Sequence, residues 1–172
     1  MGQGARFRLF PQTLSVILLL LIAAPQVAVA ATVTTTFNVQ ITITNACVIV
    51  SATNINFGSV GVIGTPGVSA TGTITTQCTL LAPYNVGLDA GAGTGATVAA
   101  RLMTSAATNT VTYSLFQDVA HTLVWGNTVA TNTVASVGTG ASQAFTVFGH
   151  VPSQTTPASG VYNDTITVTV TF

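Results

Sequence analysis

The chain has 172 residues, of which 48% are hydrophobic and only 3% are charged. This composition excludes nucleic acid as an expected partner, because phosphate binding needs clustered Lys and Arg. Ordinary soluble domains are charged at about a quarter of their residues. The low charged share therefore suggests a surface that is covered by another molecule. The length and the hydrophobic share predict a single folded domain with a real core.

Residues 1–30 have the pattern of a secretory signal peptide. Arg6 and Arg8 precede an apolar run over 14–24, and Ala28-Val29-Ala30 has the small-x-small spacing that signal peptidases accept. The run is shorter than the roughly 20 residues of a transmembrane helix. We expect cleavage after residue 30 and no membrane span afterwards. The mature chain would carry one Arg, three Asp and no Lys, a net charge of −2.

Residues 32–44, TVTTTFNVQITIT, alternate between two kinds of side chain. Because successive side chains of a strand point to opposite faces, this pattern predicts a strand with one apolar face. At about 3.3 Å per residue, the part from Val33 to Ile43 would reach roughly 36 Å. Such a strand can be the first strand of a self-contained sandwich, or it can fill a groove in a neighbouring molecule. One face carries Val33, Thr35, Phe37, Val39, Ile41 and Ile43.

Cys47 and Cys78 are the only cysteines, and an even count in an exported chain predicts one disulfide. The alternative, a pair of metal ligands, lacks the close spacing and the accompanying histidines of such sites. We expect neither a metal nor any other cofactor.

The rest of the chain predicts short strands separated by loops rich in Gly and Pro. With no helical period in the mature chain, this indicates an all-β sandwich or barrel. The last strand mirrors the first, because its apolar side chains share one face opposite a row of Thr. Strands are expected over 47–50, 71–78, 84–89, 101–103, 111–117, 123–126, 142–151 and 162–172, with loops over 58–67, 91–95 and 152–160.

Nothing in the pattern predicts an enzyme. His121 and His150 stand far apart, so we expect each to be a separate surface or turn residue. Asp118 and Asp164 are interpreted as hydrogen-bonding residues of a turn and a strand edge. There is no G-x-S-x-G motif for a serine nucleophile. A secreted hydrolase would need a convergent acid and base, which the sequence does not indicate.

Four stretches together resemble the spore coat protein U domain family, whose members include subunits of archaic chaperone–usher pili such as the Csu pilus rod subunit. The resemblance covers nearly the whole mature chain, and its most specific part is the ending. The stretches are FNVQITITNAC over 37–47, Asn56-Phe57-Gly58, residues 113–118 followed by 123–126, and GVYNDTITVTVTF over 160–172.

The resemblance implies an incomplete immunoglobulin-like β-sandwich of the pilin type, which a donated N-terminal strand completes. It implies a signal peptide over 1–30, a donor strand over 31–44 carrying the six apolar-face residues named above, and a pilin domain over 45–172. Cys47 and Cys78 match the family's disulfide positions. The carboxylate after Phe172 would bind basic residues of a chaperone. The acceptor groove and chaperone contact would involve Ile166, Val168, Val170 and Phe172.

The expected function is then a structural subunit of a surface pilus that supports adhesion or biofilm formation. The implied partners are identical or homologous pilins, a periplasmic chaperone and an outer-membrane usher, which assemble the fibre by donor-strand exchange. One alternative is a small outer-membrane β-barrel, although the cysteine pair and the few aromatic residues fit it poorly. Another is a secreted β-sandwich binding protein.

Overall fold

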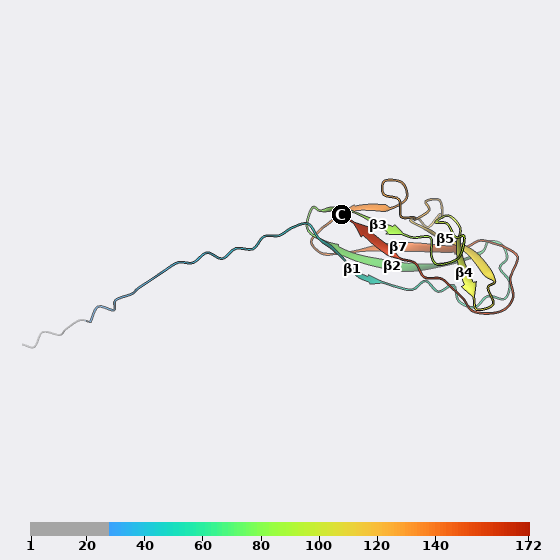
Figure 1. Ribbon diagram of the computed structural model, residues 1–172, viewed down its shortest axis with the longest axis horizontal. Helices are drawn as coiled ribbons and strands as arrows, with labels where there is room; N and C mark the ends of the chain where they lie inside the picture. Colours follow the sequence, from blue (N-terminus) through green and yellow to red (C-terminus); the bar gives the residue numbers. More distant parts are fainter. Residues whose placement is uncertain (1–27) are drawn as a thin grey trace, which may run out of the picture. The chain divides into compact units, whose positions relative to one another are not determined.

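The computed structural model describes residues 28–172 (Figure 1). The predicted signal peptide, residues 1–30, lies outside the described residues except at its last three positions. The chain divides into two units, one ending at Gln40 and one beginning at Ile41, and each is described by itself. Residues 28–46 form no strand, so the strand expected over 32–44 is absent from this structure. An extended segment becomes a strand only when a neighbouring backbone hydrogen-bonds to it.

Residues 28–172 form two sheets, of which the larger has six strands, and every pairing in it is antiparallel. Its longest pairing joins β2 to β7 and runs in unbroken register from Val68 opposite Val151 to Gln77 opposite Ser142. The strands lie in the order β1 (Cys47–Ala52), β2 (Val68–Cys78), β7 (Ser142–Val151), β5 (Thr110–Phe116), β4 (Arg101–Ser105) and β8 (Tyr162–Asn163).

The smaller sheet has three antiparallel strands, in the order β6 (Val134–Val137), β3 (Pro83–Leu88) and β9 (Val168–Thr171). The last strand, β9, is therefore an edge strand of this sheet, as the first strand, β1, is of the other. Among residues 28–172 the structure contains no helix long and apolar enough to cross a membrane.

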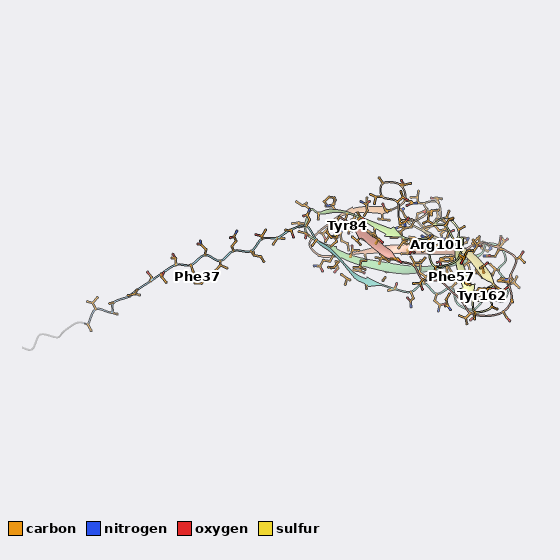
Figure 2. The ribbon with its side chains drawn as sticks, in the orientation of Figure 1. Phe37, Phe57, Tyr84, Arg101 and Tyr162 are labelled. Atoms are coloured by element: carbon orange, nitrogen blue, oxygen red, sulfur yellow. A yellow bond between two sulfur atoms is a disulfide. The ribbon has the colours of Figure 1, made fainter. Side chains whose placement is uncertain are left out.

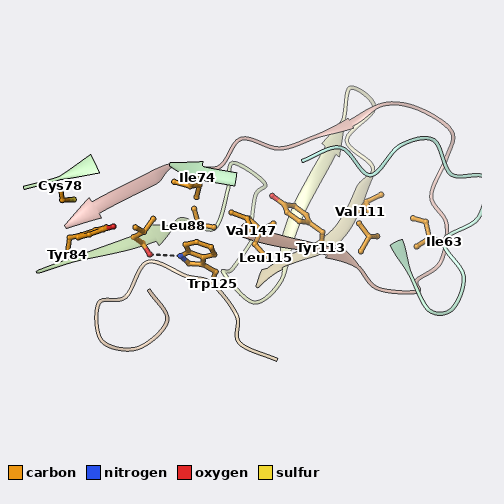
Figure 3. Packing of buried hydrophobic residues seen from close by; sticks show 12 residues of the cluster. Ile63, Ile74, Cys78, Tyr84, Leu88, Val111, Tyr113, Leu115, Trp125 and Val147 are labelled. Carbon is orange, nitrogen blue, oxygen red and sulfur yellow. Dashed lines mark hydrogen bonds between the residues drawn. The ribbon is translucent and has the colours of Figure 1, made fainter. Parts of the chain in front are cut away.

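The core lies between the two sheets, where alternate residues of each strand meet (Figure 3). Trp125 is buried among them, and its indole N–H donates to the carbonyl oxygen of Val86 at 2.8 Å. This alternation follows from the two-residue period of a strand, which sends every second side chain inward. The fold is thus the predicted all-β sandwich. Its inward side chains include Ile74, Cys78, Tyr84, Val86, Leu88, Val111, Tyr113, Leu115, Val147 and Val151.

Cys47 and Cys78 form the predicted disulfide, which joins directly opposed residues of β1 and β2. It closes a loop with a sequence separation of 31 residues. In the chain-entropy model, such a loop stabilises the folded state by about 3 to 4 kcal/mol.

Three differences from the sequence predictions concern individual strands. The strand expected over 162–172 is divided, because β8 pairs with β4 in the large sheet whereas β9 pairs with β3 in the small one. Residues 123–126 form only an isolated bridge, between Phe116 and Val124. Strand β6 was not predicted, because the two valines of its short sequence, VASV, fall on opposite faces and show no alternation. Apart from the strand expected over 32–44, the other predicted strands are present.

Candidate functional site

A groove of about 1020 Å³ with an apolar floor opens along one side of the domain 41–172. Its two rims are residues 52–61, which follow β1, and residues 156–168, which lead into β9. Phe57 and Tyr162, one from each rim, lie at the same end of the domain (Figure 2). The floor consists of core side chains from both sheets, namely Ile74, Leu88, Val111, Tyr113, Leu115, Val147 and Val151.

The groove lies where an edge strand of one sheet, β1, and an edge strand of the other, β9, leave the sandwich open. Within residues 28–172, β1 pairs only with β2 and β9 pairs only with β3, so each leaves one backbone edge unpaired. An unpaired edge beside an apolar cleft is a site where an additional strand can pair. The sandwich therefore has a vacant strand position.

The first rim is fitted closely to the sheet by two inward-facing glycines. A Cβ at Gly72 would come within 2.8 Å of Ile55, and one at Gly149 within 2.9 Å of the Phe57 ring. The missing side chains thus make room for Ile55 and Phe57, which pack against the core at the side of the groove. This part of the site was not predicted, because the sequence does not show which strand a glycine faces.

The second rim is fixed by two carboxylates. Asp164 accepts a hydrogen bond from the Tyr113 hydroxyl at 2.7 Å and one from the backbone N–H of Ala92 at 2.8 Å. Asp89 accepts from the backbone N–H of Thr167 at 2.9 Å. The segment between β8 and β9 is therefore held at both ends, as expected for Asp164 at a strand edge.

The pKa shifts at this rim follow from the same contacts. Burial, together with the hydrogen bond to the Asp164 carboxylate, raises the pKa of Tyr113 well above its usual value. For Asp89, burial opposes ionisation, but hydrogen bonds from Thr167 and Gly91 outweigh it and hold the pKa below its usual value. Tyr113 is thus a neutral donor and Asp89 an ionised acceptor at neutral pH, so both act as structural contacts.

Residues 33–43 are apolar on one face and exposed to solvent. Phe37, labelled in Figure 2, is 84% exposed. Contiguous apolar exposure of this extent is rare on soluble monomers and indicates a surface that is covered by a partner. The large side chains involved are Val33, Phe37, Val39, Ile41 and Ile43, which are between 75% and 96% exposed, and Thr35 between them is also exposed.

The residues expected at the acceptor groove take different places. Ile166 and Val168 line it, whereas Val170 packs against the core beyond its lining. Phe172 is 61% exposed and is not part of the lining. Most of the floor and the whole first rim were missed by the sequence analysis, which named only residues of the last strand.

One expectation about the histidines is wrong. The rings of His121 and His150 are stacked, with centroids 4.6 Å apart, because the turn after β5 folds back over the outer face of β7. Asp118 shapes that turn, as expected, by accepting from the backbone N–H groups of Thr122 and Leu123. In the described part of the chain, no three His, Cys, Asp or Glu side chains gather as metal ligands would.

Comparison with known proteins gives three consistent results. The family model of the Spore Coat Protein U domain matches residues 33–169. Protein U of Myxococcus xanthus is 38% identical over 158 residues, which span 84% of this chain and 88% of that protein. The fold is similar, with a TM-score of 0.55, to a chain in the crystal structure of the CsuC–CsuE chaperone–tip adhesion subunit pre-assembly complex from the archaic chaperone–usher Csu pili of Acinetobacter baumannii. That match has 24% identity and covers 76% of this chain but only 40% of that chain.

Proposed function

This chain belongs to the Spore Coat Protein U domain family, and from that premise we propose that it is a structural subunit of a surface pilus assembled by the chaperone–usher route. In this proposal, residues 31–44 form a donor segment and residues 45–172 the pilin domain. The family consists of structural subunits, so the expectation that the chain is not an enzyme is confirmed.

One observation carries the proposal: the same chain has a vacant strand position and an unused strand. The groove of about 1020 Å³ has an apolar floor and lies between the segment that follows the edge strand β1 and the segment that leads into the edge strand β9. Residues 33–43 have the alternation of a one-faced strand but form none. An added strand would satisfy the free backbone groups of β9 while its apolar face covers the groove floor.

The energetics favour insertion. If the five large apolar side chains of residues 33–43 are buried, each contributes roughly 1.5 to 3 kcal/mol of transfer free energy before the entropy of ordering is subtracted. Because donor and groove lie at different places on one chain, donation to a neighbour is a head-to-tail contact. Such contacts do not close on themselves and so generate a filament.

An open apolar groove would make the free subunit prone to aggregation. We propose that a periplasmic chaperone occupies it until an outer-membrane usher exchanges the chaperone for the donor segment of the next subunit. The support is that the structurally similar chain is a subunit captured in a chaperone complex. The finished fibre would support adhesion or biofilm formation at the cell surface.

A matched pair of substitutions tests the donor segment. Phe37→Asp places a charge on the apolar face, whereas Asn38→Asp places the same charge on the opposite face of the same strand. We expect wild type and Asn38→Asp to give a ladder of polymers on gels that disappears when the sample is heated. Phe37→Asp should give no ladder. Normal fibres from Phe37→Asp would refute donation by this segment.

A mixing experiment tests the groove separately. A Phe37→Asp subunit cannot donate but keeps an intact groove, so it should accept a donor and then stop growth. Adding it to wild-type subunits should shorten fibres in proportion to its share, as measured by electron microscopy. A peptide of residues 32–44 should bind the Phe37→Asp subunit, and the same peptide with the Phe37→Asp change should not. Unchanged fibre lengths would count against the groove as acceptor.

A further inference from the structure

The turn between β2 and β3 exposes two leucines at one end of the domain. Leu80 is 62% exposed and Leu81 is 75% exposed. The backbone of the turn is nevertheless fixed, because the N–H of Leu81 donates to the carbonyl of Gly138 at 2.8 Å and the N–H of Gly138 donates to the carbonyl of Ala82 at 2.8 Å. We call residues 80–81 the dileucine turn.

The folding of the domain does not explain the dileucine turn. Leu81 has φ = 64°, in the left-handed region where Gly or Asn is the favoured residue and a bulky side chain is strained. Its side chain gains nothing from burial in return. Strain of this kind that persists at an exposed position points to a role outside the fold of the single domain. The apolar surface continues onto Val137, which is 51% exposed.

The dileucine turn lies beside the point where the donor segment joins the domain. Thr79, which precedes Leu80, is hydrogen-bonded to that junction through both its backbone and its side chain. Its N–H donates to the carbonyl of Ala46 at 2.9 Å, and its hydroxyl accepts from the N–H of Ala46 at 3.1 Å. The same hydroxyl donates to the carbonyl of Thr44 at 3.2 Å. A molecule that holds residues 33–43 in its groove must therefore come close to this turn.

The direction of the donor strand determines which surface meets the turn. Every strand pair in both sheets is antiparallel, so an added strand that continues the pattern runs antiparallel to β9. Its last residue, Ile43, then leaves the groove at the end where the chain enters β9. That mouth carries Val60 and Val161, which are 53% and 75% exposed.

We propose that the dileucine turn of one copy packs on Val60 and Val161 of the next, as a second contact between subunits beside the donor strand. This inference rests on the proposed function and goes beyond it, because donation alone requires no contact between the domains. The contact pairs an exposed apolar surface with another and buries both. It would limit how freely successive subunits rotate about the short link at residues 44–46.

A photo-crosslinking amino acid at position 81 tests the contact in assembled fibres. We expect it to link neighbouring copies, with the linked peptide mapping to residues 59–62 or 159–162. The matched control is the same amino acid at Val119, which is also 75% exposed and should give no link between copies. If the ladder forms but position 81 gives no link between copies, this inference is overturned and the proposed function is not. Links from position 81 to residues 170–172 would have the same meaning. Absence of the ladder would overturn the proposed function as well.

A double substitution, Leu80→Ser with Leu81→Asn, tests the consequence without endangering the fold, because Asn tolerates the left-handed conformation better than Leu. The ladder should persist, since the donor segment is unchanged. The fibres should become more flexible, with a persistence length reduced at least about twofold in electron micrographs. An unchanged persistence length would overturn the inference.

Discussion

The hydroxyl of Tyr113 donates a hydrogen bond of 2.7 Å to Oδ2 of Asp164, and this bond connects β5 to the segment between β8 and β9. Both residues line the groove. The Phe57 ring stands edge-on to the Tyr113 ring, with centroids 6.3 Å apart, so Tyr113 contacts both rims. Tyr113 thus connects the two rims of the groove.

Tyr113→Phe should therefore lower both stability and groove function. It keeps the ring but leaves Oδ2 of Asp164 without its donor, a loss of about 1 to 3 kcal/mol for a partly buried carboxylate. We expect that decrease in the free energy of unfolding in guanidinium, and weaker binding of the 32–44 peptide. The control is Thr112→Ser on the opposite face of β5. Equal peptide affinity for Tyr113→Phe and wild type would contradict the assigned role.

Arg101 is fully buried and has no ion pair among the described residues. Its guanidinium donates instead to the carbonyl oxygens of Asp89, Val98, Leu88 and Trp125, at 2.7 to 3.2 Å. Arg101→Met fills the volume but leaves these carbonyls without donors, so we expect a loss of at least about 3 kcal/mol. Arg101→Lys should lose less, because it keeps one donor group. A loss below about 1 kcal/mol for Arg101→Met would show that water replaces the guanidinium.

The features of the fold that depend on local sequence pattern could be predicted from the sequence. Two-residue alternation identified the longer strands, and the cysteine count identified the disulfide. It could not assign strands to sheets, so the change of sheet within residues 162–172 was missed. The polar Asn163-Asp164-Thr165 at that change gives no signal by itself, because its meaning lies in contacts with Ala92 and Tyr113 far away in the sequence.

The groove was predicted only through its last strand. Its first rim depends on Gly72 and Gly149 facing Ile55 and Phe57, a tertiary relationship that no local period shows. Arg101 was likewise identified as the only basic residue of the mature chain, but its burial was not foreseen, because a lone charge is normally expected on the surface. The stacking of His121 on His150 depends on the turn after β5, whose course the sequence does not show.

Limited proteolysis should give two contrasting results. Arg101 is the only Lys or Arg after residue 8, and it is buried. Trypsin should therefore leave the folded chain intact and cut it only after global unfolding. Chymotrypsin should cut after the exposed Phe37 in free subunits and not in fibres, where the segment is covered. Rapid tryptic cleavage of native protein would show that β4 opens locally.

The histidine pair predicts a loss of stability on mild acidification. Burial and the nearby His121 lower the pKa of His150, whose Nδ1 is 3.0 Å from the hydroxyl oxygen of Ser69. The unfolded chain, in which a histidine titrates near pH 6.5, then binds more protons than the folded chain. The stabilisation is fully present above about pH 6.5 and is lost as the pH falls through the lower folded pKa.

Between pH 7 and pH 5 the free energy of unfolding should therefore decrease, and His150→Gln should make the profile flatter. Asp118 does not contribute in this window. Backbone hydrogen bonding from Leu123 is the main cause that lowers its pKa, so its stabilisation is lost only below about pH 4. His121→Phe keeps an aromatic ring beside His150 and removes the charge, so it should flatten the profile partially. An identical pH profile for wild type and His150→Gln would show that the stacked pair does not couple protonation to folding.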